Sequence, residues 1–163
     1  MRVLVAGPSK WKAKTQSNPN LKREAERHLK QIFESLEEES PEVGTSLQLG
    51  IDTMVAMLCA RHLFDYHAIL SCDNQDESWT PEQRKAFLYL LQNATSIEKA
   101  TASFPVPGCI NTQRELLNNW WAKSSKRILI LLRYGPLSKT QMERIKLARR
   151  VNAEVLTVKL DGE

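Results

Sequence analysis

The 163-residue chain lacks the features that mark several large classes of protein. Its cysteines, Cys59, Cys72 and Cys109, are odd in number and far apart, and no Cys-x-x-Cys pair occurs. This pattern argues against a disulfide framework and a zinc site, and it favours free thiols in a reducing cytoplasm. No apolar run is long enough to span a membrane, and the N-terminus becomes polar too early for a secretory signal. We therefore expect a cytoplasmic protein with no membrane partner and no bound metal.

The chain is also not rich in glycine or proline, and neither sign of charge is in large excess. The chain contains 6 glycines and 7 prolines, and 23 lysines and arginines stand against 19 acidic residues, a net charge of +4. This composition excludes collagen-like, low-complexity and disordered classes. The small basic excess permits an anionic ligand or a nucleic acid without requiring either. No Gly-x-Gly-x-x-Gly or Walker lysine motif occurs, so we expect neither a standard NAD site nor a P-loop, and no cofactor.

Short apolar runs alternate with amphipathic stretches along the whole chain. The expected strands cover residues 2–6, 45–49, 66–71, 96–99, 127–132 and 153–158, and the expected helices cover residues 18–39, 51–64, 80–91, 111–122 and 138–151. The polar segment 9–20 predicts a loop. Alternating strands and helices are typical of parallel strands with helical crossovers. We therefore predict an α/β fold with a Rossmann-like open parallel sheet, three α/β/α layers and a single domain over residues 1–163.

The first candidate ligand site follows the first predicted strand. In an open α/β sheet, ligands bind at the carboxyl ends of the strands. Gly7, Pro8 and Ser9 lie at such an end. The glycine lets a ligand approach the backbone, and the Ser9 hydroxyl can hydrogen-bond a phosphate. The alternative is a glycine turn that binds nothing.

A second candidate site precedes the helix predicted over residues 51–64. Gly50 comes directly before this helix, and Asp52 and Thr53 lie in its first turn. The free amides and partial positive charge of a helix N-terminus suit an anion. The Asp52 carboxylate can accept hydrogen bonds from a ribose. The alternative is that Asp52 only caps its own helix.

Five further candidates lie beyond the third predicted strand. Gln75 offers a donor and an acceptor to the edge of a base, and Trp79 offers a flat face for stacking. Gln113, Arg114 and Asn118 share one predicted helix, on which Arg114 and Asn118 occupy the same face. An arginine at that position can grip a phosphate with two hydrogen bonds. The alternatives are that Trp79 packs on the helix that follows it, and that Arg114 forms a surface salt bridge.

The sequence also predicts where two tryptophans and three histidines lie. Trp120 and Trp121 are neighbours on a predicted helix, and neighbouring helical positions diverge by about 100°. We therefore expect one of them in the core and the other at a pocket rim or a homodimer interface. His28, His62 and His67 are scattered, and the candidate loops contain no Ser-His-Asp or Cys-His constellation.

In their order along residues 2–135, these motifs resemble the SLOG superfamily, the Rossmann-like group of the lonely-guy phosphoribohydrolases and the DprA DNA-processing proteins. The likeness is greatest to its small stand-alone YpsA-like branch. It is carried by a strand followed by Gly7-x-Ser9, by Leu49-Gly50-Ile51-Asp52 at a helix start, by Gln75-x-x-x-Trp79, and by Gln113-Arg114-x-x-x-Asn118 before an apolar strand. The resemblance implies a nucleotide or nucleotide-derived ligand held by these residues, and a homodimer or higher homo-oligomer.

Two departures from the family pattern bear on activity. The sequence has no Pro-Gly-Gly-x-Gly-Thr segment with a downstream glutamate, as the lonely-guy enzymes have, and Leu47-Gln48-Leu49-Gly50 replaces a glycine pair. We therefore expect a binding protein or sensor rather than an enzyme. One alternative is cleavage of an N-glycosidic bond, with Asp52 as catalytic nucleophile or as stabiliser of an oxocarbenium-like sugar. The other is nucleic-acid binding through the lysines of residues 10–14 and the basic helix at residues 144–150, which acidic neighbours disfavour.

Overall fold

The computed structural model describes residues 1–100 and 107–162. The chain divides into two compact units. The first, which we call the terminal unit, joins Met1–Pro41 to Ser124–Glu163, and the second, the central unit, comprises Glu42–Lys123. Within the described residues, no helix combines the length and the apolar composition that a membrane crossing requires.

Three parallel strands form the sheet of the terminal unit. Strand β5 (Arg127–Arg133) lies between β1 (Arg2–Ala6) and β6 (Glu154–Lys159). Residues 128–132 of β5 are at most 4% exposed. Both faces of this middle strand are therefore covered, which explains its nearly continuous apolar sequence, RILILLR.

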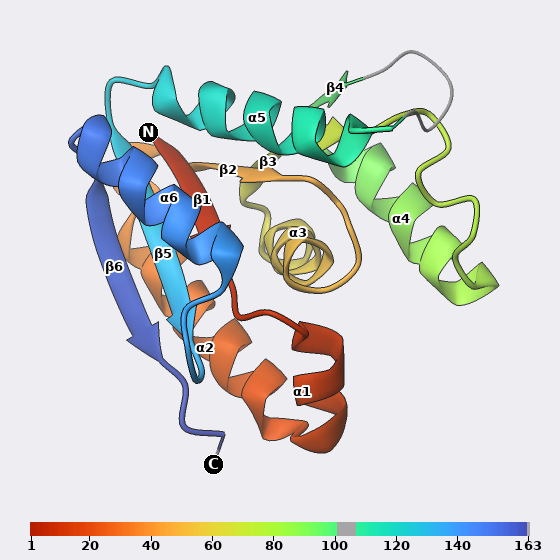
Figure 1. Ribbon diagram of the computed structural model, residues 1–163, viewed down its shortest axis with the longest axis horizontal. Coiled ribbons are helices and arrows are strands. Elements are labelled where there is room, and N and C mark those ends of the chain that lie inside the picture. Colours follow the sequence, from red (N-terminus) through yellow and green to blue (C-terminus); the bar gives the residue numbers. More distant parts are fainter. Residues whose placement is uncertain (101–106, 163) are drawn as a thin grey trace. The chain divides into compact units, whose positions relative to one another are not determined.

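Apolar spacing and capping set the helices of the terminal unit. They are α1 (Trp11–Ser17), α2 (Asn20–Ser35) and α6 (Lys139–Arg150), with a short 3-10 turn, η1, at Glu37–Glu39 (Figure 1). Helix α2 buries Leu21, Ala25, Leu29 and Phe33, which recur every four residues and are each 0% exposed. This single apolar stripe packs α2 onto the core of the unit.

The central unit has three parallel strands of its own. Strand β3 (Asp65–Leu70) lies between β2 (Glu42–Thr45) and β4 (Ser96–Lys99). The helices are α3 (Ile51–His62), α4 (Pro81–Asn93) and α5 (Cys109–Ala122). Figure 1 shows α3 on one side of β2 and β3, and α5 on the other. The carboxyl ends of β2 and β3 therefore lie between elements from both faces.

Glycine lets helix α5 lie close to strand β2. A Cβ atom at Gly44 would be 2.6 Å from Trp120 Cζ3 and 2.8 Å from Leu117 Cδ1. Trp120 also packs against the ring of His67, with centroids 5.2 Å apart, whereas Trp121 is 0% exposed. One of the two tryptophans is thus in the core, as expected, and the other covers the sheet.

The predicted α/β fold of Rossmann-like type with parallel strands is confirmed, but two boundaries near the N-terminus are wrong. Residues 9–20 contain helix α1 instead of only a loop, because Trp11 is 6% exposed and anchors this segment. The helix predicted over residues 18–39 begins at Asn20 and ends at Ser35. Pro19 occupies the cap position, and Asn18 Oδ1 accepts a hydrogen bond from the Asn20 amide at 3.2 Å.

Strand β2 lies earlier than the strand predicted over residues 45–49. It ends at Thr45, because Ser46 bonds to Asp52 and Leu47 has a left-handed φ of 53°. The apolar residues that suggested a strand belong to a loop, in which Leu47 is 0% exposed. This loop connects β2 to α3, and it forms the first part of the candidate site.

Candidate functional site

The loop from β2 to α3 is held by the first turn of α3. Asp52 Oδ2 accepts a hydrogen bond from the Ser46 amide at 2.9 Å and another from the Ser46 hydroxyl. Thr53 Oγ1 donates to Gln48 O at 2.7 Å, and Thr45 Oγ1 donates to Asp52 O at 3.0 Å. The two side chains predicted to contact ligand, Asp52 and Thr53, therefore both stabilise this loop. Asp52 does not cap its own helix, because Gly50 occupies the cap position without a side-chain cap bond, and the Asp52 carboxylate accepts from Ser46 of the preceding loop instead.

Gly50 forms an open corner at the start of α3. Its φ is 109°, and no heavy atom lies within 4 Å of where a Cβ would be. The amides of Ile51 and Asp52 donate to no acceptor within the described residues. Unpaired amides at a helix N-terminus carry partial positive charge. The corner therefore combines space at the Cβ position of Gly50 with two backbone amides that have no described acceptor.

Three glutamines meet at the carboxyl ends of β2 and β3, and we call them the glutamine cluster: Gln48, Gln75 and Gln113. Gln113 Oε1 accepts from Gln48 Nε2 at 3.1 Å, and Gln75 Oε1 accepts from Gln113 Nε2 at 3.3 Å. Gln75 Nε2 and Gln113 Nε2 both donate to Ser46 O, at 3.2 and 3.0 Å. The cluster thus ties the β2–α3 loop to the segment after β3 and to α5.

The members of the cluster differ in exposure. Gln113 is 2% exposed and also donates to Ile69 O at 2.7 Å, so it positions the strand ends. Gln75 and Gln48 are half-buried. Gln75 Oε1 already accepts from the Ser71 amide at 3.0 Å, whereas Gln48 Oε1 has no hydrogen bond within the described part of the chain. Gln48 is therefore the member best able to meet a ligand.

The sequence did not identify Gln48 as a site residue. It stands between two leucines in the loop before Gly50, where the sequence drew attention only to a missing glycine pair. Its polar side chain, directly before a glycine and a helix start, was the available indication. The contact with Gln113 joins positions 65 residues apart, and local patterns do not report such pairs.

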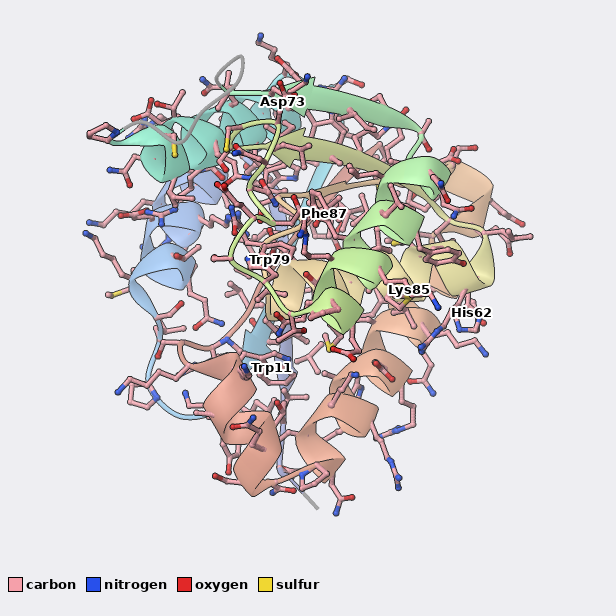
Figure 2. All side chains as sticks on the ribbon, turned by 90° about the vertical axis from the view of Figure 1, so that its right-hand side faces the viewer. Trp11, His62, Asp73, Trp79, Lys85 and Phe87 are labelled. Atoms are coloured by element: carbon pink, nitrogen blue, oxygen red, sulfur yellow. The ribbon has the colours of Figure 1, made fainter. Side chains whose placement is uncertain are left out.

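Trp79 packs on helix α4. Its ring meets that of Phe87 edge to face, with centroids 5.2 Å apart and an interplanar angle of 80° (Figure 2). Thr80 caps the same helix by accepting from the Gln83 amide at 3.2 Å. Packing on the helix that follows it was one of the two predictions for Trp79, and the contact with Phe87 agrees with it.

The remaining predicted residues are distributed over both units. Arg114 and Asn118 lie one turn apart on α5, half-buried, and both interact with other parts of the chain. Gly7, Pro8 and Ser9 belong to the terminal unit. There Pro8 is buried, Ser9 is exposed, and Gly7 O accepts from the Ser138 hydroxyl at 3.2 Å.

No titratable cluster in the described residues suggests metal or thiol chemistry. Groups of three or more His, Cys, Asp or Glu that could hold a metal ion are absent from that part of the chain. The three cysteines are free and buried, and burial raises the pKa of the Cys59 thiol to about 12. Because the thiolate is the reactive form, Cys59 is not a nucleophile at neutral pH.

The geometry defines a class of protein: an α/β protein with parallel strands and a cluster of polar side chains at strand carboxyl ends. No protein-family model matches the chain, and no curated protein matches it.

Proposed function

We propose that the protein binds a nucleotide or nucleotide-derived small molecule at the carboxyl ends of β2 and β3, and acts as a binding protein or sensor. One observation carries this proposal. The open corner at Gly50, with the unpaired amides of Ile51 and Asp52, lies in the same loop as Gln48, whose Oε1 is free of described hydrogen bonds.

The Gly50 corner supplies the charge complement for a phosphate. Two backbone amides and the N-terminal end of a 12-residue helix would complement the charge of an anion. Because Gly50 has no side chain, an oxygen can approach the backbone directly. The Asp52 oxygen Oδ1 makes no hydrogen bond within the described residues. It can accept from a ribose hydroxyl while Oδ2 keeps its bonds to Ser46.

The glutamine cluster supplies selectivity for a base. Amide groups match the mixed donors and acceptors on the edge of a nucleobase. Gln113 and Gln75 are engaged with backbone groups, so they fix Gln48 instead of rearranging to meet a ligand. A preorganised amide loses little entropy when it binds. Recognition of the base therefore depends mainly on Gln48.

The bonds of Asp52 favour binding over glycosidic cleavage. A carboxylate nucleophile must leave its attacking oxygen free and aligned with the sugar. Asp52 Oδ2 is committed to two donors of Ser46, and Oδ1, the remaining oxygen, is the one that accepts from a ribose hydroxyl in the proposed complex. The arrangement suits a group that holds a hydroxyl.

Calorimetry with mono-, di- and cyclic nucleotides tests the proposal. We expect at least one nucleotide to bind wild-type protein, and Gln48→Leu to weaken that binding by about tenfold or more, which is 1.4 kcal/mol. Gln92→Leu on α4 is the matched control, because Gln92 is exposed and outside the cluster. Absence of binding by every nucleotide to folded protein would overturn the proposal.

Membership of the SLOG superfamily, a homodimer and a cytoplasmic location belong to the same proposal. The buried free thiols Cys59, Cys72 and Cys109 are compatible with a reducing compartment. Exposed Leu88 and Tyr89 on α4, and Ile97 on the edge strand β4, offer apolar area to a second copy. Sedimentation equilibrium measures the oligomeric state, and a monomer at every concentration would remove the dimer from the proposal.

A further inference from the structure

The terminal unit contains a hollow of about 370 Å³ that the proposed function does not use. Its lining comes from helix α2 and from the segment after β6: Asn20, Arg23, Glu24, Arg27 and Asp161. We call it the α2 hollow. Its volume falls within the range of small-molecule sites, at the lower end. Charged side chains of both signs surround it.

One wall of the α2 hollow is fixed by a buried carboxylate. Glu24 is 8% exposed, and its two oxygens accept from the Asp161 and Gly162 amides at 2.9 and 3.0 Å. Asn18 Nδ2 donates to Gly162 O at 2.7 Å. Gly162 has a φ of 77°, and a Cβ there would lie 2.5 Å from Asn18 Nδ2. These bonds hold the segment after β6 against α2, and both Glu24 oxygens already accept a hydrogen bond from the chain.

Lysines on α2 have acidic partners one turn away. Lys22 Nζ lies 3.9 Å from Glu26 Oε1, and Lys30 Nζ lies 3.5 Å from Glu34 Oε1. Opposite charges four residues apart stabilise a helix by about 0.2–0.5 kcal/mol, and like charges destabilise it by a similar amount. The outer surface of α2 thus follows the pattern expected for a solvated helix.

Arg23 and Arg27 break that pattern. They are also four residues apart, but they carry the same charge and line the same hollow. Neither forms an ion pair within the described residues, where the one side-chain contact of Arg27 is with His28 Nε2 at 3.5 Å. Like charges one turn apart that form no ion pair are a local inconsistency of the kind found at functional sites. The two guanidinium groups are available to a ligand.

Asp161 supplies the opposite charge. Its backbone amide is bonded to Glu24, whereas its side chain is exposed, lines the hollow and forms no ion pair in the described chain. The lining of the hollow therefore includes a carboxylate that can pair with a cationic group of a ligand held by Arg23 and Arg27. A phosphate dianion would face the carboxylates of Asp161 and Glu24, which disfavours it.

We propose that the α2 hollow binds a small zwitterion of the amino-acid class. The ligand carboxylate lies between the Arg23 and Arg27 guanidinium groups, which match its geometry with paired hydrogen bonds. The ligand ammonium group donates to the Asp161 carboxylate. Both charges of the ligand are then paired with side chains that lack ion-pair partners in the described chain.

Titration of the full chain with each standard amino acid, acetate and inorganic phosphate tests this inference. Calorimetry measures affinity, and nuclear magnetic resonance follows the Asp161 and Gly162 amides. We expect at least one amino acid to bind and to shift these amides, with acetate and phosphate weaker by about tenfold or more. The double variant R23Q/R27Q and the single variant D161N should each lose about tenfold in affinity.

Matched variants separate binding from folding. D161N keeps the backbone amide that bonds Glu24, and Arg23 and Arg27 are exposed, so these variants should remain folded by circular dichroism. The double variant K22Q/K30Q and the variant E154Q change equal charge elsewhere on α2 and on β6, and should bind like wild type. Failure of every amino acid to bind, equal binding of acetate or phosphate, or unchanged binding by R23Q/R27Q would each overturn the inference.

Discussion

The terminal and central units each use one buried glutamine to hold the carboxyl ends of their strands. In the terminal unit, Gln141 of α6 is 1% exposed. Its amide donates to Ala6 O at 3.0 Å and to Leu132 O at 2.7 Å, and its Oε1 accepts from the Ser138 amide at 3.0 Å. Both ends of the side-chain amide are used inside the unit. Backbone groups are its only partners there among the described residues.

In the central unit, the corresponding buried glutamine bonds to side chains as well as to backbone groups. Gln113 of α5 donates to Ile69 O and Ser46 O, but its oxygen and its remaining contacts go to the half-buried side chains of Gln48 and Gln75. The same chemistry that closes one strand end therefore leaves polar side chains partly exposed at the other. This difference indicates where a ligand can bind, because a ligand gains hydrogen bonds only from polar atoms whose bonds are not already made within the chain.

Alkaline pH should give the largest difference between the units, because it destabilises the central unit. Two side chains that are uncharged at neutral pH, Cys59 and Tyr66, are buried in the core of that unit. Burial raises the pKa of Cys59 from 9.0 to about 12, and burial, with smaller contributions from Cys59 and Tyr89, raises that of Tyr66 from 10.0 to about 12. The stability that depends on their neutral forms is fully present below pH 9. It is lost as pH rises towards 12, by about 1.4 kcal/mol per pH unit for each ionising group.

Urea unfolding at about pH 8 and about pH 11 measures this loss. The double variant Cys59→Val/Tyr66→Phe serves as the control, because it removes both titrations. Its stability should depend less on pH than that of wild type, although loss of the Tyr66 hydroxyl bond to Leu90 O lowers it at every pH. Equal stability of wild type at the two pH values would show that these groups titrate normally.

Replacing each buried glutamine by leucine compares the two strand ends directly. Gln141→Leu removes the side-chain partner of two buried carbonyls and of the Ser138 amide, and should lower the free energy of unfolding by about 2–4 kcal/mol. Gln113→Leu should cost about 1–3 kcal/mol and should also abolish nucleotide binding, because Gln48 loses its support. Urea unfolding and calorimetry measure the two effects.

Exposed positions on the same helices provide the controls for these leucine variants. Lys146→Gln on α6 and Glu115→Gln on α5 should change stability by less than about 0.5 kcal/mol. Loss of nucleotide binding in a folded Gln141→Leu protein would contradict the contrast drawn between the units, since Gln141 has no place in the proposed site.

Local sequence patterns were sufficient for most of the fold. The run RILILLR predicts a strand buried on both faces, and the segment Thr80-Pro81-Glu82-Gln83 predicts the capping box that begins α4. Such features depend on neighbouring residues. The errors came where tertiary contacts decide the structure. Buried Trp11 stabilises a helix in a polar segment. The Ser46 amide bonds to Asp52, so strand β2 ends before Ser46.

The candidate site was less predictable than the fold. Gln75, Gln113 and Asp52 were chosen for what they could offer a ligand, and the structure places them at one strand end, but their described bonds are to the chain itself. A sequence does not reveal how many bonds of an amide are already used. The left-handed conformation of Leu47 has no marker in residue type either, because leucine rarely adopts it.

Two glycines with positive φ provide a milder comparison of the units. Gly50 in the central unit and Gly135 in the terminal unit have φ of 109° and 79°, and a Cβ at either would meet no atom within 4 Å. Alanine at each position should therefore cost backbone strain alone, about 1–3 kcal/mol in the free energy of unfolding. Only Gly50→Ala should weaken nucleotide binding, since its methyl group enters the open corner. Equal weakening by Gly135→Ala would argue against that corner as the phosphate site.

The two capping boxes should give the smallest difference. Thr80 caps α4 and Ser138 caps α6, each accepting from the amide three residues on. Loss of a cap costs about 1 kcal/mol, and Thr80→Ala should lower the free energy of unfolding by that amount. Ser138 also donates to Gly7 O at 3.2 Å, so Ser138→Ala should cost about 0.5–1.5 kcal/mol more.

Urea unfolding of both capping variants decides whether this additional bond matters. Thr80→Ser and Ser138→Thr keep the capping oxygen, and each should retain most of the stability that its alanine counterpart loses. If Ser138→Ala costs no more than Thr80→Ala, the bond to Gly7 O adds nothing to the terminal unit. The carboxyl end of β1 would then be held by two side chains of α6, Gln141, which donates to Ala6 O, and Arg144, which donates to Val5 O.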